Sequence, residues 1–138
     1  MEHEIYLVEI PFMLDHASVV KRLRLPKSDG RHEAMVSELL ERSRAMAHMK
    51  AVYRVSHAQV IDRDTLDISG TRFTSRALSR NLVDQDTVFP FIATVGKELD
   101  EFSVPAGNIM RQFCLDGIKT LALVSAVDYL AESLKEKY

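Results

Sequence analysis

Few residues of this 138-residue chain have the spacing that catalytic chemistry requires. Its five histidines form no His-x-x-x-His or Cys/His pattern, so we expect no metal site. Cys114 is the only cysteine and lies in an apolar stretch, where we expect a small buried hydrophobe. Acid–base catalysis needs titratable groups gathered in one pocket, and the sequence presents only isolated ones. We therefore expect no catalytic residues and no independent catalytic activity.

The junction at Gly96 and Lys97 is the first candidate for ligand binding. It follows an apolar stretch that ends near Thr94, and a glycine before a short helix can present backbone N–H groups to an anion. The phosphate-binding loop pattern is absent, because Phe91 stands where its first glycine belongs and Glu98 stands where Ser or Thr should follow the lysine. We therefore predict a tight turn, with anion binding as the alternative.

The second candidate lies in the most apolar part of the chain, around Asp116 and Gly117. Asp116 could pair with Lys119 or accept a hydrogen bond from Thr120, at helical spacings of three and four residues. Glycine costs about 1 kcal/mol relative to alanine inside a helix, so Gly117 suggests the close approach of another backbone or a ligand. We predict a shallow ligand or partner groove formed by Thr94, Gly96, Asp116, Gly117 and Thr120.

These residues must be positioned by a fold that mixes short strands with helices. Alternating apolar residues predict strands over 5–10, 51–61 and 66–68, and near Phe73. Apolar residues at a spacing near 3.6 predict helices over 15–23, 31–48, 75–82, 97–102 and 108–135, and turn formers predict a loop over 25–30. This order predicts an α+β fold with a mixed or antiparallel sheet and flanking helices. The length favours a single domain over 1–138.

Two segments have an apolar pattern that predicts burial on several sides. Residues 88–95 are apolar on both faces, so we expect a central strand there, with Pro90 near its start. The helix over 108–135 carries apolar side chains on more than one side. We expect this long C-terminal helix to be buried by its neighbours, or in part to face another protein chain.

Composition excludes several classes of partner. The 18 basic and 20 acidic residues give a net charge of −2, and the sequence has no basic stripe. We therefore do not expect nucleic acid as a main partner. No window reaches about 18 apolar residues, so we expect no membrane span. The first residues have no secretory signal pattern, and a cytoplasmic location is therefore expected.

Several short motifs occur in an order that resembles a known family. They are Phe91-Ile92-Ala93-Thr94-Val95-Gly96, then Leu99-Asp100, Leu115-Asp116-Gly117, and Ala126-Val127 with Leu130. This order resembles the reactivation (activation) domain of cobalamin-dependent methionine synthase, and more closely the small free-standing relatives of that domain. Upstream pieces, such as Ala51-Val52-Tyr53-Arg54 and Ile68-Ser69-Gly70, extend the resemblance over most of the chain.

The resemblance implies a methionine synthase activation domain-like fold and a connection with cobalamin held by a partner protein. In the full-length enzyme this domain binds S-adenosylmethionine and docks on the cobalamin-bearing module, which permits reductive remethylation of oxidised cobalt. The family's cosubstrate motif, Arg-x-x-x-Gly-Tyr, does not occur in this sequence, and Lys119-Thr120 stand where Gly-Ser is expected. We therefore transfer no family binding residue and do not expect S-adenosylmethionine to bind.

Three functional hypotheses follow. The first is an accessory protein that docks on a corrinoid protein or corrinoid methyltransferase and supports its methylation or reactivation. The second is an S-adenosylmethionine-binding reactivation factor whose site is rearranged. The third is a non-catalytic assembly subunit that forms a homodimer through its long helix. The first has the most support, because it combines the family pattern with the missing cosubstrate motif.

Overall fold

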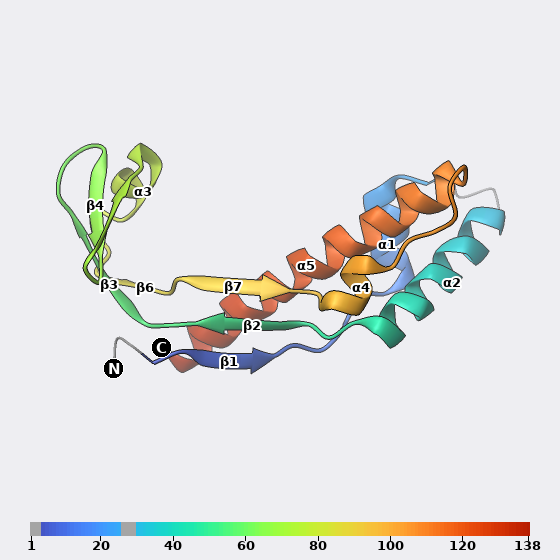
Figure 1. Cartoon of the computed structure of the whole chain (residues 1–138), viewed down its shortest axis with the longest axis horizontal. Helices are drawn as coiled ribbons and strands as arrows, with labels where there is room; N and C mark the ends of the chain where they lie inside the picture. Colours follow the sequence, from blue (N-terminus) through green and yellow to red (C-terminus); the bar gives the residue numbers. More distant parts are fainter. Residues whose placement is uncertain (1–3, 26–29) are drawn as a thin grey trace. The chain divides into compact units, whose positions relative to one another are not determined.

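The structure is a computed structural model that describes residues 4–25 and 30–138 (Figure 1). It confirms the α+β prediction, with two sheets, five helices and a long C-terminal helix among the described residues. Most of the loop predicted over 25–30 falls on 26–29, outside the described residues. The elements in chain order are β1 (Tyr6–Glu9), α1 (His16–Leu23), α2 (Gly30–Met46), β2 (Lys50–Tyr53), β3 (Ser56–Val60), β4 (Thr65–Ile68), β5 (Thr71–Thr74), α3 (Arg76–Asn81), β6 (Thr87–Val88), β7 (Phe91–Thr94), α4 (Lys97–Glu101) and α5 (Ile109–Lys137).

The chain divides into two compact units. Unit 1 consists of Val52–Ile92 and the N-terminal segment through Leu7, and unit 2 consists of Val8–Ala51 and Ala93–Tyr138. The division falls inside β1, β2 and β7, so each of these strands contributes residues to both units. The single domain expected over 1–138 stays a prediction.

Unit 1 contains a four-stranded antiparallel sheet in the order β5-β4-β3-β6. Ala58 pairs with Ile68 across β3 and β4, and Leu66 pairs with Phe73 across β4 and β5. Ser69 and Gly70 both have positive φ, which is the backbone that a tight two-residue hairpin turn requires. Helix α3 contacts β4 in the same unit.

Two predicted strands are corrected by the structure. The strand expected over 51–61 is broken into β2 and β3, which belong to different sheets. Tyr53 and Ser56 are both buried, so two non-buried residues between them shift the alternation by one position and end the first strand. The strand expected over 88–95 is likewise broken into β6 and β7.

Proline explains the second break. Pro90 separates β6 from β7, and it has no N–H to donate to a sheet ladder, although its carbonyl accepts a hydrogen bond from Arg54 N at 3.1 Å. The sheet order β1-β2-β7 places β7 at an edge, and Phe91 and Ile92 are exposed. The expectation of a central buried strand over 88–95 is therefore wrong.

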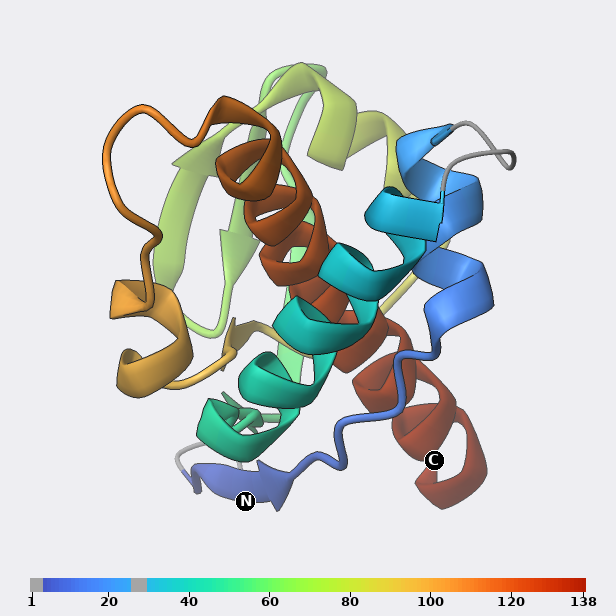
Figure 2. The same ribbon diagram turned by 90° about the vertical axis from the view of Figure 1, so that its right-hand side faces the viewer.

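Unit 2 is built from helices, and α1, α2 and α5 contact one another (Figure 2). One stripe of α5 is buried among them, with a spacing of mostly four residues that repeats along one side of a helix. This stripe consists of Cys114, Leu115, Ile118, Ala122, Ala126 and Leu130. Burial of α5 on several sides was expected, but the structure buries this one stripe. Within the described residues, no helix combines the length and hydropathy needed to cross a membrane.

Candidate functional site

A cavity of about 420 Å³ lies between the end of α1 and the first half of α5, inside unit 2. We name it the α1–α5 cavity. Its lining joins three of the predicted groove residues to two arginines and two apolar side chains. The lining residues are Arg22, Leu23, Arg24, Phe113, Asp116, Gly117 and Thr120.

Local sequence signals set the position of α1 beside this cavity. Asp15 caps the helix, because its carboxylate accepts a hydrogen bond from Ser18 N at 2.8 Å, and this bond lowers the pKa of Asp15. The helix ends at Arg24, which adopts left-handed backbone with φ of 54° and donates its N–H to Lys21 O. Arg22 and Arg24 therefore lie at the C-terminal end of α1, where this cap defines the backbone geometry.

Gly117 has a packing role in the wall of the cavity. A Cβ built on Gly117 would collide with the Leu23 side chain of α1. The close approach predicted at this glycine is therefore present, and the approaching group is a side chain rather than a backbone or a ligand. The absence of a side chain at Gly117 allows α1 to pack closely against α5.

Of the two partners predicted for Asp116, Lys119 is wrong, and Thr120 donates to its backbone carbonyl rather than to its carboxylate. Its carboxylate accepts a hydrogen bond from Gln112 Nε2 at 2.7 Å. The Thr120 hydroxyl donates to the backbone carbonyl of Asp116 at 2.9 Å, so it does not reach the carboxylate. Lys119 Nζ donates to the carbonyls of Asp100 and Phe102 at 2.8 and 2.5 Å, which links α5 to the segment around α4. Without an ion pair to Lys119, Asp116 is exposed and lines the cavity.

Thr94 and Gly96 do not line the α1–α5 cavity. Gly96 has φ of 97°, and its N–H donates to Thr94 Oγ1 at 3.0 Å. A Cβ on Gly96 would lie 2.9 Å from His48 N, which itself donates to the carbonyl of Val95. The predicted tight turn is confirmed. The Gly96 N–H already has a partner, and the anion alternative at this junction stays a prediction.

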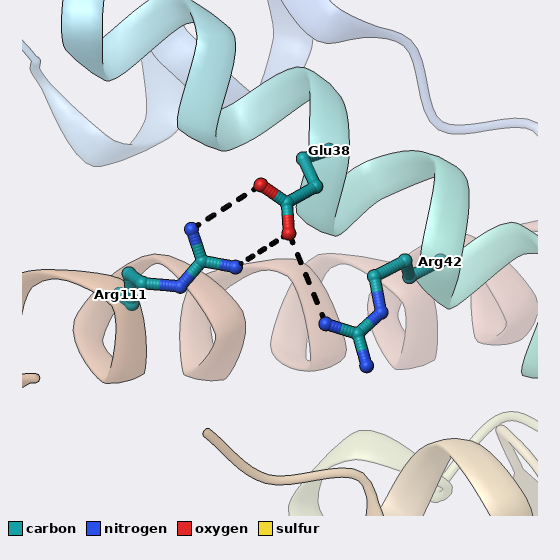
Figure 3. A network of polar contacts seen from close by, with 3 residues as sticks. All are labelled: Glu38, Arg42 and Arg111. Atoms are coloured by element: carbon teal, nitrogen blue, oxygen red, sulfur yellow. Dashed lines mark hydrogen bonds and ion pairs between the residues drawn. The ribbon is translucent and has the colours of Figure 1, made fainter. Parts of the chain in front are cut away.

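Sequence reasoning missed an ion-pair network that joins α2 to α5 (Figure 3). Arg111 contacts Glu38 through both terminal nitrogens, at 2.8 and 3.4 Å, and Arg42 lies 3.8 Å from the same carboxylate. The hydrogen bond and charge of Arg111 hold the pKa of Glu38 below its ordinary value. Glu38 and Arg111 are 73 positions apart, so no local sequence pattern could have paired them.

The side chains that line the α1–α5 cavity are suited to binding a polar partner. Two guanidinium groups, one carboxylate and one hydroxyl can donate to or accept from a polar partner. Cys114 lies in the same part of α5, but it is buried, and burial raises the pKa of its thiol. In the described ranges, no group of three His, Cys, Asp or Glu side chains could hold a metal ion.

An exposed surface with apolar side chains toward both of its ends continues from this cavity along α5, with Asp116 and Thr120 between the two apolar groups. We name it the α5 apolar strip, and Phe113 belongs to both features. At 100° per residue, its members fall on the side of the helix away from the buried stripe. Ile109 is 82% exposed and Phe113 is 51% exposed. The strip consists of Ile109, Met110, Phe113, Leu123 and Val124.

No model of a protein family matches the chain, and no curated protein matches it. The resemblance to the methionine synthase activation domain therefore stays a prediction, carried by the order of the motifs in the sequence.

Proposed function

We propose that this protein is an accessory protein that docks on a corrinoid protein or a corrinoid methyltransferase and supports its methylation or reactivation. The α5 apolar strip and the neighbouring α1–α5 cavity form the docking face. The observation that carries this proposal is the exposure of large apolar side chains on a helix that buries only one stripe on its other side.

Leaving this strip exposed to water has a cost in free energy, which a partner that covers it would remove. Burying apolar surface stabilises a complex by about 25 cal/mol per Å², and exposed apolar patches often mark interaction sites. An aromatic side chain beside a cavity can act as an anchor, and Phe113 has this position. Arg22 and Arg24 on one side and Asp116 on the other supply a polar rim of both charges.

The proposal assigns cobalamin to the partner protein. The family motif for S-adenosylmethionine is absent from the sequence, and the proposal gives this chain no such site. The protein acts through contact rather than through its own reaction, and a cytoplasmic location belongs to the same proposal. Isothermal calorimetry with S-adenosylmethionine tests this part, because measurable binding would favour a reactivation factor with a rearranged site.

The docking test titrates the full chain against corrinoid proteins and corrinoid methyltransferases from the same organism. We expect saturable binding below about 50 µM, which Phe113→Asp weakens at least about tenfold by placing a charge in the strip. Phe73→Asp is the matched control, because Phe73 is an exposed phenylalanine on β5 of unit 1. Equal weakening by both variants, or no binding of the parent chain, would contradict the proposal.

A homodimer is the second candidate function, and the same apolar strip favours it. Two copies could each cover the strip of the other through a symmetric interface. Light scattering at about 100 µM distinguishes the two candidates, because a dimer that Phe113→Asp dissociates would favour the assembly subunit. A monomer at this concentration would remove the homodimer and leave the strip free for another partner.

A further inference from the structure

A second cavity lies in unit 1, between the β3–β4 connection and α3, and its volume is about 580 Å³. Its lining is rich in arginine, in contrast to the apolar surface of α5. The lining residues are Val60, Asp62, Arg63, Arg76, Ser79, Arg80 and Val83. The docking proposal involves none of these residues.

The three arginines differ in how they are held. Arg76 donates from Nε to Asp64 Oδ1 at 3.0 Å, which orients its guanidinium group. The side chains of Arg63 and Arg80 have no hydrogen bond or ion pair with any other residue that the structure describes. Arg76 is paired with Asp64, so Arg63 and Arg80 carry the unpaired positive charge at this cavity, and an anion between them would pair with it. Guanidinium groups match the oxygens of phosphate in geometry as well as in charge.

The carboxylate in the lining does not neutralise this site. Asp62 Oδ1 accepts a hydrogen bond from Asp64 N at 2.9 Å, so Asp62 serves the turn between β3 and β4. This hydrogen bond, with further ones from Thr65, lowers the pKa of Asp62 and keeps it charged. With Asp64 counted as the partner of Arg76, three arginines and two carboxylates lie at this site, which leaves one positive charge in excess.

Ser79 supplies an independent observation. Its side chain lines the cavity from α3 and is 3% exposed. Its buried hydroxyl has no hydrogen-bond partner in the described part of the chain. Buried polar groups nearly always have a partner, so this hydroxyl, like that of Ser43 elsewhere in the fold, can take an added acceptor such as a water or a ligand oxygen. A phosphate oxygen is such an acceptor.

We propose that this cavity binds a small organic phosphate, with its phosphate group among Arg63, Arg76, Arg80 and Ser79. The apolar walls formed by Val60 and Val83 contact the organic part of the ligand. The volume exceeds what one phosphate ion needs, so an ester fits this site better than the bare ion. This inference is independent of the docking proposal, because it concerns unit 1.

The test titrates the full ¹⁵N-labelled chain with phenyl phosphate and, separately, with inorganic phosphate at constant ionic strength. We expect saturable shifts of amides in α3 and in the β3–β4 connection, with tighter binding of phenyl phosphate than of inorganic phosphate. Arg80→Gln and Arg63→Gln should each weaken binding about tenfold, because each removes one charge-assisted contact. Ser79→Ala removes the hydroxyl donor and should also weaken binding.

Arg54→Gln is the matched control, because Arg54 belongs to the same unit and does not line the cavity. It changes the net charge equally, so we expect less than about twofold weakening. Amide spectra of each free variant establish that unit 1 is still folded. No saturable binding up to about 10 mM, or equal weakening by Arg54→Gln and Arg80→Gln, would overturn the proposal.

Discussion

At the scale of single residues, two helix-associated glycines are required for different reasons. Gly96 needs its positive φ and also its missing side chain, because the His48 backbone lies where a Cβ would be. Gly117 has no positive φ and only leaves space for Leu23. A flexible leucine can move aside, whereas a backbone cannot do so without disturbing its hydrogen bonds. Gly96 is therefore the less replaceable of the two.

Gly96→Ala should lower the free energy of unfolding by more than about 2 kcal/mol, measured by urea denaturation. Left-handed backbone at a non-glycine residue costs about 1–3 kcal/mol, and the clash with His48 adds to that cost. Gly107→Ala is the matched control, because Gly107 has φ of 90° but no neighbour within 4 Å of its added Cβ. Equal losses in both variants would show that packing against His48 contributes nothing.

Residue-scale prediction from sequence succeeded where the interaction is local. The helices predicted from Asp15 and Ser75 begin there, and each of these side chains caps its helix by accepting a hydrogen bond from the N–H three residues ahead. The prediction that Lys119 pairs with Asp116 was wrong, and the carboxylate contacts Gln112, which stands at the same helical spacing as Thr120. Lys119 of α5 donates instead to the backbone carbonyls of Asp100 and Phe102, outside its own helix. Only the folded chain brings these acceptors within reach of Lys119.

At the scale of elements, the Glu38–Arg111 pair ties the start of α5 to the middle of α2. The Arg111 side chain is only 21% exposed, whereas Glu38 is half exposed. Arg42 extends the contact, because its guanidinium also lies 4.7 Å from the ring centroid of Phe102. A bidentate arginine–carboxylate pair restricts orientation more than a lysine would. These contacts hold the helix that carries the α5 apolar strip.

The stabilisation from Arg111 should depend on pH. The pKa of Glu38 is lowered in the folded state, so the contribution is fully present above the ordinary glutamate pKa of 4.5. It is lost as the pH falls through the lowered pKa, because protonated Glu38 no longer attracts Arg111. Urea denaturation of the parent and of Arg111→Gln should therefore give different stabilities at pH 7 and converging stabilities below pH 4.5.

Lys135→Gln provides the comparison for this pH series. It removes an exposed pair with Glu132, in which both side chains are more than 70% exposed. Exposed pairs of this kind contribute little, so we expect a small effect at every pH. If the effect of Arg111→Gln were as small, or did not change with pH, the bidentate pair would not stabilise the packing of α2 and α5.

At the scale of the whole molecule, the buried apolar side chains are unevenly divided between the two units. Unit 2 contains most of them, including Val19, Val36 and Leu39 and the stripe of α5. The fully or nearly fully buried apolar side chains of unit 1 are Tyr53, Ala58 and Leu66. Apolar burial is the main favourable term in folding, so unit 2 has the larger source of stability.

Native-state hydrogen exchange should reflect this division. Amides in β3 and β4 should exchange at least about tenfold faster than amides between Ile118 and Ala126 of α5, after correction for intrinsic rates. The reason is that local opening of unit 1 exposes less buried apolar surface. Equal opening free energies in both units would contradict this expectation and would favour the single cooperative domain predicted from the length.

The sequence by itself determined the kinds of element and most of their positions. Helical spacing, cap residues and glycine turns act within a few residues, so they can be read along the chain, and the long C-terminal helix and the α+β class followed from them. It also determined that Gly96 would end a strand in a tight turn. These features depend on local backbone preferences, which hold whatever the rest of the chain does.

Only the tertiary structure decided how those elements are divided between the two sheets and the two units, and which side chains they bring together. It assigned the pieces of the two broken strands to different sheets, because their pairing partners come from distant segments. It placed Arg22 and Arg24 beside Asp116, gathered three arginines around Ser79, and separated Thr94 and Gly96 from the cavity. Contacts between residues far apart in the chain depend on packing, and periodicity along a sequence does not specify them.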